Sequence, residues 1–246
     1  MKRYFLAALA VAMSLLFTGC VGVAFNAGNN REMVRGSGAV SSVEYPVQDY
    51  DMVLIETGVE LIYSSEKSDK IVVEIHDNLV EYLDIKVEDG VLIIDAAKHI
   101  ASSEKTPKVY ISNPNFKGLS VGGYLDMPKG DKITGESFLL DVAGAASVEM
   151  EFDVDRLEVV GAGAADLTLL GRADRAEIEM SGAGKIRALG LQTKDAVIDI
   201  SGAGDLQISC SDNLEVNVAG AGNVSYRGDP HVRKSTSGFA SVDKIG

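Results

Sequence analysis

The chain has 246 residues, of which 46% are apolar, so it can bury a sizeable core and is not a disordered polymer. Its net charge is −13, from 23 basic and 36 acidic residues, which disfavours binding to a nucleic acid. With no Trp, three His and two Cys, it has little material for an aromatic sugar platform or a zinc site of clustered Cys and His.

The first residues have the composition of a targeting segment. Lys2 and Arg3 precede an apolar run from Phe5 to Phe17, which only Ser14 interrupts. As a helix this run would reach about 20 Å, short of the ~30 Å hydrocarbon core of a bilayer. We therefore interpret it as the apolar region of a signal peptide rather than a membrane span.

The apolar run ends in the sequence FTGC, residues 17–20, which resembles a bacterial lipobox. In that motif small residues precede a Cys that is diacylated and begins the mature protein. The resemblance predicts a lipoprotein signal peptide at 1–19, lipidation of Cys20 and attachment to a membrane through N-terminal acyl chains. The alternative is an ordinary secretory signal with an incidental Cys.

The residues after Cys20 predict how the mature protein is held. Residues 20–42, with Gly28, Gly36 and Gly38 among them, are expected to form a flexible tether. Val21, rather than Asp, follows the Cys, which by general lipoprotein sorting favours the outer membrane and leaves open which side of it the protein faces. The rest, 43–246, is expected to be one β-solenoid domain, irregular at 43–117 and regular at 118–246.

The irregular part contains several expected β elements. Apolar, β-branched runs at 52–63 and 71–75 predict strands, and 108–112 predicts another. Residues 83–95 predict a hairpin that turns at Asp89 and Gly90. A single short helix is expected at 77–82.

The regular part is an internal repeat that turns on a glycine. One glycine from each copy recurs at spacings of 22, 19, 19, 20, 18 and 18: Gly122, Gly144, Gly163, Gly182, Gly202, Gly220 and Gly238. Aliphatic residues alternate with polar residues before each glycine and lie four residues after it, which is strand periodicity. Copies stacked in register would bury one continuous apolar column, so the repeat predicts an all-β, parallel β-solenoid.

Two details of the repeat have a physical meaning. Glycine suits a corner that needs either a positive φ or a close approach of two backbones. In the last copy Lys234 and Thr236 replace aliphatic residues, which predicts a capping rung that protects an open sheet edge.

The layout resembles a family of bacterial lipoproteins described as putative auto-transporter adhesins, head GIN domain. The resemblance rests on the lipobox, the DMV and GVEL strands at 51–53 and 58–61, the DGVL hairpin at 89–92, the KVYIS strand at 108–112 and the SGAGD-type copies. It covers roughly 42–246. It implies a β-helical fold at a bacterial envelope and an adhesin-like role, and it supplies no catalytic residues.

Several motifs resemble parts of cofactor-binding or catalytic sites. Residues 157–165, LEVVGAGAA, resemble the start of a dinucleotide-binding fold, but Asp166 and a strand-like run follow where a helix should. His76, His99 and His231 lie in unrelated contexts, and Ser181 and Ser201 lack a nucleophile elbow. Cys210 follows Leu206 and Ile208 at period two, which predicts a buried thiol.

Acidic residues line the predicted outer faces. Glu158, Glu177 and Glu215 share one face, and Asp141, Glu179, Asp199 and Asn217 occupy the next outward position. A glycosidase needs two carboxylates, one with a raised pKa. Without an evident Arg neighbour, these acids are expected to be a solvated face, and a cation between Glu179 and Asp199 is a less favoured alternative. Lys185 is expected between Asp166 and Asp205.

These observations favour a non-enzymatic, envelope-anchored adhesin or scaffold that binds an unidentified protein or glycan through an extended surface. No catalytic residue, cofactor or metal is expected. Two alternatives stay open: a carbohydrate-active enzyme, either a polysaccharide lyase or a hydrolase, and a partner in envelope assembly or sensing. A deep groove lined by acids together with Arg or Lys would favour the enzyme, and flat faces of small residues would favour the adhesin.

Overall fold

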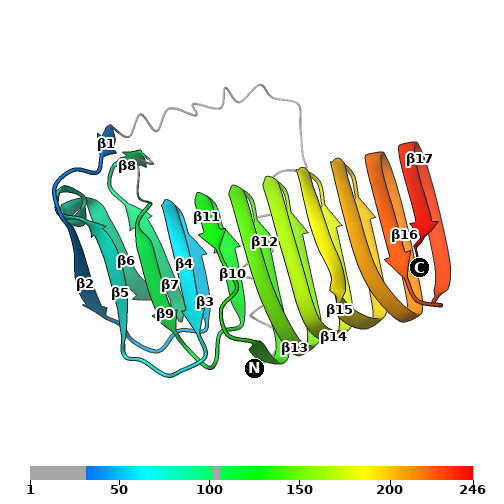
Figure 1. Ribbon diagram of the computed structural model, residues 1–246, viewed down its shortest axis with the longest axis horizontal. Coiled ribbons are helices and arrows are strands. Elements are labelled where there is room, and N and C mark those ends of the chain that lie inside the picture. Colours follow the sequence, from blue (N-terminus) through cyan, green and yellow to red (C-terminus); the bar gives the residue numbers. More distant parts are fainter. Residues whose placement is uncertain (1–31, 102–105, 246) are drawn as a thin grey trace. The chain divides into compact units, whose positions relative to one another are not determined.

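The computed structural model describes residues 32–101 and 106–245, which form a parallel β-solenoid (Figure 1). About seven turns, here called rungs, recur with a spacing near 19 residues, as the sequence predicted. The strands are β1 (Met33–Arg35), β2 (Val40–Pro46), β3 (Met52–Ile55), β4 (Gly58–Ser64), β5 (Lys70–His76), β6 (Leu83–Glu88), β7 (Val91–Ala96), β8 (His99–Ala101), β9 (Lys108–Ser112), β10 (Gly118–Val121), β11 (Tyr124–Met127), β12 (Ile133–Val142), β13 (Ala145–Gly161), β14 (Ala164–Met180), β15 (Ala183–Ile200), β16 (Ala203–Arg227) and β17 (His231–Lys244). No helix in the described part of the chain is long and apolar enough to cross a membrane.

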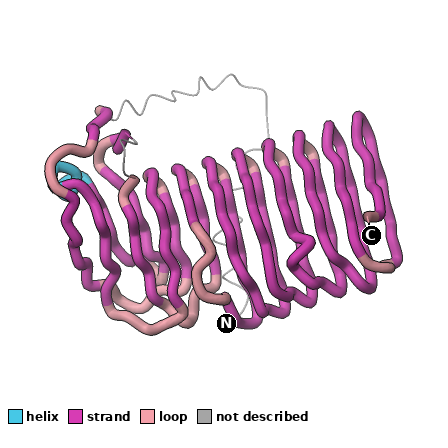
Figure 2. Tube along the Cα trace, viewed as in Figure 1, coloured by secondary structure: helices cyan, strands magenta, loops and turns pink. Residues whose placement is uncertain are grey.

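Each long strand bends around the solenoid and belongs to two successive rungs. The first half of β13 pairs with β11, and its second half pairs with β12. The strand therefore turns at its middle, near Asp155, where the ladder to β14 skips a residue. We call this bend the far edge and the opposite bend, at the repeated glycines, the glycine edge. Figure 2 shows that the C-terminal rungs are almost entirely strand.

Every second side chain of a rung points into the core. One column runs in register from Leu140 through Val159, Ile178 and Ile198 to Val216, and each of these residues is buried. No single rung could cover its apolar face, so stacking in register is what removes these side chains from water. The alternation of apolar and polar residues thus determines both where the strands form and the register in which successive rungs pair.

Aromatic rings stack through the core where the irregular and regular parts meet. Phe116 lies between Tyr63 and Phe138 with ring centroids 5.1 Å from each, and Phe152 follows Phe138 at 5.3 Å. The spacing is close to the ~4.8 Å separation of paired strands, so each ring occupies one level of the stack. The rings join the two parts into one continuous core.

Close approach, and not a positive φ, explains most glycines of the glycine edge. Of the seven repeated glycines, only Gly220 and Gly238 have a positive φ, of 154° and 92°. A Cβ added to Gly163 would overlap the main-chain oxygen of Gly144 on the preceding rung. The neighbouring backbone donates to the same oxygen, since Ala164 N lies 2.9 Å from it. Glycine therefore lets successive corners stack at the spacing of the strands.

The N-terminal part closes the solenoid with antiparallel strands. β3 and β4 form a rung that pairs in parallel with β7 and β9. β6 then pairs antiparallel to β7, and β2 and β5 continue antiparallel beyond β9. Asp89 and Gly90 turn the β6–β7 hairpin with φ values of 50° and 81°, as that dipeptide predicts. The expected helix is the 3₁₀ helix η1 (Asp77–Tyr82).

Part of the predicted tether carries strands. The described portion of residues 20–42 begins at residue 32 and contains β1 and the first residues of β2. β1 pairs with β8, and Ser41 Oγ, in β2, donates to Asp77 Oδ1 at 2.5 Å. The glycines at 36 and 38 indicated flexibility, because glycine is frequent in linkers. The strands form here because they pair with segments that are distant in the sequence, which local composition does not reveal.

The C-terminal rung has the expected capping character. In register, Lys234 of β17 follows Val216, so it occupies a core column. Its Nζ instead donates to the carbonyl of Val242 at 3.1 Å, across the end of the core. An inward-facing charge discourages another strand from pairing with an open edge.

Candidate functional site

The residues singled out in the sequence are scattered. The predicted signal peptide at 1–19 and the predicted lipidation site Cys20 lie outside the described residues. His76 ends β5 and His99 begins β8, both in the N-terminal part, whereas His231 begins the last strand, β17. The sequence 157–165 is the end of β13, a corner and the start of β14, so no helix follows it to receive a phosphate.

Arginines accompany the acidic face, contrary to the expectation of isolated acids. Glu177 Oε1 accepts a hydrogen bond from Arg175 Nε at 2.6 Å, and Glu177 Oε2 accepts one from Arg156. These contacts lower the pKa of Glu177, with the Arg175 hydrogen bond as the largest cause. The signal was present in the sequence, since Arg-x-Glu places both residues on one face of a strand. Glu158 lies in register beside Glu177 and within 4.0 Å of Arg156.

Glu179, Asp199 and Asn217 of the second group border a small hollow of about 230 Å³. Glu179 and Asp199 are register neighbours there, as expected, and Asn217 Nδ2 donates to Asp199 Oδ1 at 2.8 Å. Asp141 does not line the hollow and accepts a hydrogen bond from Ser120 Oγ at 3.2 Å. The described residues contain no group of three or more His, Cys, Asp or Glu side chains arranged to hold a metal ion. Lys185 lies between Asp166 and Asp205 in register, but Asp166 is contacted by Arg187 instead.

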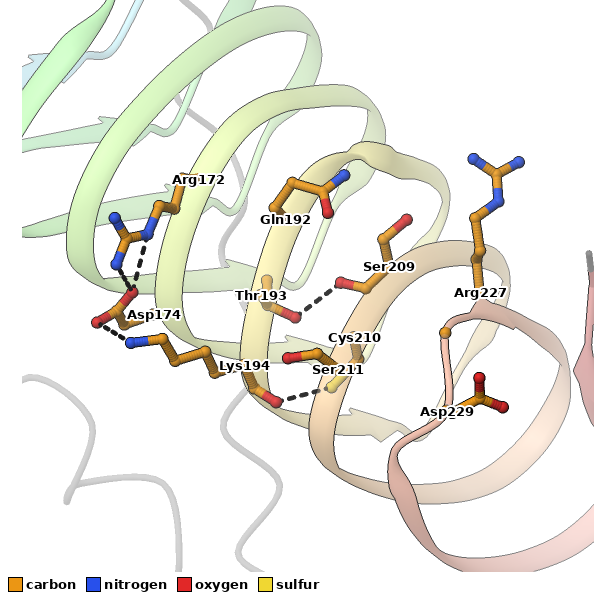
Figure 3. A pocket seen from close by; sticks show the side chains of 11 residues that line it. Arg172, Asp174, Gln192, Thr193, Lys194, Ser209, Cys210, Ser211, Arg227 and Asp229 are labelled. Atoms are coloured by element: carbon orange, nitrogen blue, oxygen red, sulfur yellow. Dashed lines mark hydrogen bonds and ion pairs between the residues drawn. The ribbon is translucent and has the colours of Figure 1, made fainter.

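A polar groove with a volume of about 540 Å³ lies at the far edge across β14, β15 and β16 (Figure 3). Its floor is a row of short side chains, Ser209, Cys210 and Ser211. Longer side chains stand on both sides, with Arg172, Asp174, Gln192 and Lys194 on the two preceding rungs and Arg227 and Asp229 on the following one. The groove therefore forms where one rung of small residues lies between rungs of large ones.

The pairing between β15 and β16 changes register beside the groove. Ala188 pairs with Ile208, but the next paired residue is Gln192, opposite Ser209, so residues 189–191 bulge from β15. Bulges redirect side chains and are frequent beside functional sites. The sequence carried a signal in its glycine spacing, which is 20 for this rung and 18 for the next, but the spacing alone does not place the bulge at the far edge.

Ion pairs fix the walls of the groove. Asp174 accepts hydrogen bonds from Arg172 Nη2 at 2.6 Å and from Lys194 Nζ at 3.0 Å (Figure 3). The hydrogen bonds from Lys194 and then Arg172 lower the pKa of Asp174. On the other wall Lys244 Nζ lies 2.5 Å from Asp229 Oδ1 and lowers the pKa of that carboxyl. Both carboxylates are therefore ionised at neutral pH.

The floor is hydrogen-bonded and unreactive. Thr193 Oγ1 donates to the Ser209 carbonyl at 2.9 Å, and Ser209 Oγ donates to the Leu189 carbonyl at 2.8 Å. Cys210 is buried, as the alternation predicted, and its burial raises the pKa of the thiol. A protonated, buried thiol is a poor nucleophile.

Arg227 differs from the other cations of the groove. Its side chain is exposed, and its guanidinium makes no ion pair or hydrogen bond with another described residue. Gly228, with φ of 110°, packs against the Cys210 backbone, which sets Arg227 beside Ser209 on the following rung. The groove thus presents one unneutralised guanidinium.

Comparison with known proteins places this fold among bacterial proteins. A putative adhesin from Bacteroides fragilis matches with 22% identity over 86% of this chain and 100% of that chain, at a TM-score of 0.75. A putative lipid binding protein and a putative adhesin, both from Parabacteroides distasonis, match with 22% identity over 87% of this chain and 100% of theirs, at TM-scores of 0.70 and 0.69. No curated protein matches.

A family model agrees with these structures and with the resemblance seen in the sequence. The model described as putative auto-transporter adhesin, head GIN domain, matches residues 49–230, from just before β3 to the end of β16. The match includes every residue that lines the groove and all the repeated glycines except Gly238. The chain therefore belongs to the family of putative auto-transporter adhesins with a head GIN domain.

Proposed function

We propose that this protein is a non-enzymatic, lipid-anchored binding module of the bacterial cell envelope, with an adhesin-like role. The observation that carries the proposal is its membership of the adhesin family, whose model matches residues 49–230. Two solved structures with a similar fold, both described as putative adhesins, support it.

The N-terminal sequence supports the anchored part of the proposal. Cys20 follows an apolar run and two small residues, as in a lipobox, and two basic residues precede the run. Acylation at Cys20 would hold the solenoid at a membrane through residues 21–31, outside the described part of the chain. Val21 favours the outer membrane.

The outer surface suits recognition without catalysis. Along the glycine edge one outward position repeats in register as Ser147, Asp166, Lys185, Asp205 and Asn223. Strand pairing holds such polar groups about 4.8 Å apart on a rigid frame. A preorganised surface loses little entropy when it binds, which favours affinity from many modest contacts.

A carbohydrate-active enzyme is the second candidate, because the far-edge groove combines Arg, Lys and Asp. A glycoside hydrolase needs one carboxyl group with a raised pKa to donate a proton. The pKa values of Asp174 and Asp229, the carboxyl groups that line the groove, are both lowered. These carboxylates suit ionic contacts with a ligand better than proton transfer.

An array of glycans and envelope or host proteins, probed with the purified full chain, tests the proposed function. We expect saturable binding to a restricted set of ligands, and heat-unfolded protein serves as the control. The proposal fails if the folded chain binds nothing, or if it binds every basic ligand equally and releases all of them in moderate salt, as a non-specific acidic surface would.

A further inference from the structure

The far-edge groove has the properties of a ligand site with its own chemistry. Arg172, Gln192 and Ser209 follow one another in register on three successive rungs. Asp174, Lys194 and Ser211 line the groove beside them, so the long side chains of two rungs give way to a serine in each row. On the following rung the longer side chains of Arg227 and Asp229 form the other wall of the groove. Three inter-rung steps separate Arg172 from Arg227, so the groove is roughly 14 Å long. This length exceeds that of a single small anion.

Charge favours an anionic ligand. Three cations and two carboxylates line the groove, so its net charge is positive in a chain with a net charge of −13. Arg172 and Lys194 share Asp174, and Asp229 contacts Lys244 outside the groove. Arg227 therefore remains available for a carboxylate, which a guanidinium can bind through two parallel hydrogen bonds.

The rest of the lining favours a sugar over an acyl chain or an apolar peptide. No large aliphatic or aromatic side chain lines this groove in the described structure. Gln192, Ser211 and Asp229 are exposed along it and supply both donors and acceptors. Such a mixture matches the hydroxyl groups of a saccharide, each of which both donates and accepts.

We propose that this groove binds an acidic saccharide, with the sugar carboxylate on the Arg227 guanidinium and the sugar hydroxyls on Gln192, Ser211 and Asp229. The inference rests on the proposed binding function and names its site and ligand class. Ion pairs hold Asp174, Arg172 and Lys194 in place, so the wall is formed before the ligand arrives.

Calorimetric titration of the full chain with acidic trisaccharides tests the inference. The probes are trisaccharides built on galacturonate, glucuronate, mannuronate or sialic acid, each compared with its methyl ester, together with inorganic phosphate. We expect at least one acid to bind and its neutral ester to bind about tenfold more weakly or worse, because a charge-assisted contact is lost.

Two variants and a matched control locate the site. Arg227→Gln should weaken binding about tenfold or more, and Ser211→Gln should weaken it by filling the hollow. Arg233→Gln removes the same charge from β17 outside the groove and should leave affinity within about twofold. Melting temperatures of all three should stay near that of the unmodified chain, because none of these side chains is buried.

Each contrary outcome has a distinct meaning. Acid binding that survives Arg227→Gln unchanged overturns the groove assignment and leaves the proposed binding function intact. Equal binding of the methyl esters, or phosphate binding as tight as that of the saccharides, overturns the ligand class. If no acidic trisaccharide binds while the array finds other ligands, the inference fails and the proposed function stands.

Discussion

Gly163 packs directly against the main-chain oxygen of Gly144, so closely that a Cβ at residue 163 would overlap that oxygen. The same relation links Gly182 to Gly163 on the next rung. The glycine edge is thus a stack of closely packed backbones, in which an added methyl group would force the backbone of the neighbouring rung to shift.

The first prediction compares two glycines of one corner. Gly163→Ala should lower the free energy of unfolding by about 1–3 kcal/mol, because the methyl group meets backbone that cannot move away alone. Gly161 lies two residues earlier, at a buried position where a Cβ would be 3.9 Å from its nearest neighbours. Gly161→Ala should be neutral or stabilise by about 0.5–1 kcal/mol. Denaturant unfolding measures both, and equal effects would contradict the stacked-corner explanation.

The second prediction concerns acid stability. Arg175 and Arg156 lower the pKa of Glu177 in the folded state, below its unfolded value of about 4.3. The ion pairs therefore stabilise the fold above that pH, and their contribution is lost as the pH falls through the lower, folded-state pKa. Glu177→Gln should reduce the melting temperature at pH 7, and the difference should shrink toward zero near pH 2–3.

Glu136→Gln provides the control for this titration. Glu136 is exposed on β12 and forms no ion pair with another described residue. The variant should melt like the unmodified chain at every pH. A Glu177→Gln deficit that persists undiminished at low pH would show that the side chain acts by packing and not by charge.

The third prediction concerns the open edge of β17. Lys234→Leu should restore an apolar residue to a core column at the end of the solenoid, so the edge should attract a strand of another molecule. We expect sedimentation velocity to show concentration-dependent association. Lys185→Leu replaces the same residue type at an outward position in the middle of the solenoid, where the strand is paired on both sides, and this variant should not associate. If both variants associate equally, added surface hydrophobicity rather than the open edge of β17 causes the association.

The fourth prediction concerns the anchor. Cys20→Ser should prevent acylation, leaving uncleaved precursor or protein that partitions into the aqueous phase of a detergent extraction. The unmodified chain should enter the detergent phase because acyl chains bind micelles. Cys210→Ser is the control, since Cys210 is buried in the solenoid and should not affect partitioning. A Cys20→Ser protein that is processed to the mature length and still partitions as an amphiphile would contradict the lipobox interpretation.

The rungs were predictable from the sequence because their determinants are local. Alternation from Leu157 to Gly161 marks a strand, and the recurrence of Gly163 and Gly182 sets the length of a rung. The sequence predicted that glycine is needed at the corners but left open whether the cause is a positive φ or a close backbone approach. Close approach to a carbonyl depends on the neighbouring rung, so only the structure shows it. Of the antiparallel N-terminal strands, the β6–β7 hairpin was predicted, but the pairing of β2 with β5 was not, because it depends on residues about thirty positions apart.

The groove could not be predicted for a similar reason. Its depth comes from Ser209 and Ser211 lying between longer side chains on adjacent rungs, and the bulge at 189–191 sets that register. The glycine spacing shows only that two rungs differ in length. By contrast, Arg156 and Arg175 could have been placed beside Glu177 from the sequence, because i and i+2 residues share a face of a strand.

The most direct test of the central claim, binding without turnover, is to measure new reducing ends and unsaturated products when the full chain is incubated with a polysaccharide that it binds. The lowered pKa values of Asp174 and Asp229 leave neither carboxyl group suited to donate a proton. We expect the polymer to be retained by the protein and recovered at its original length. Cleavage that increases with protein concentration and disappears in Asp174→Asn would contradict it and identify the protein as an enzyme.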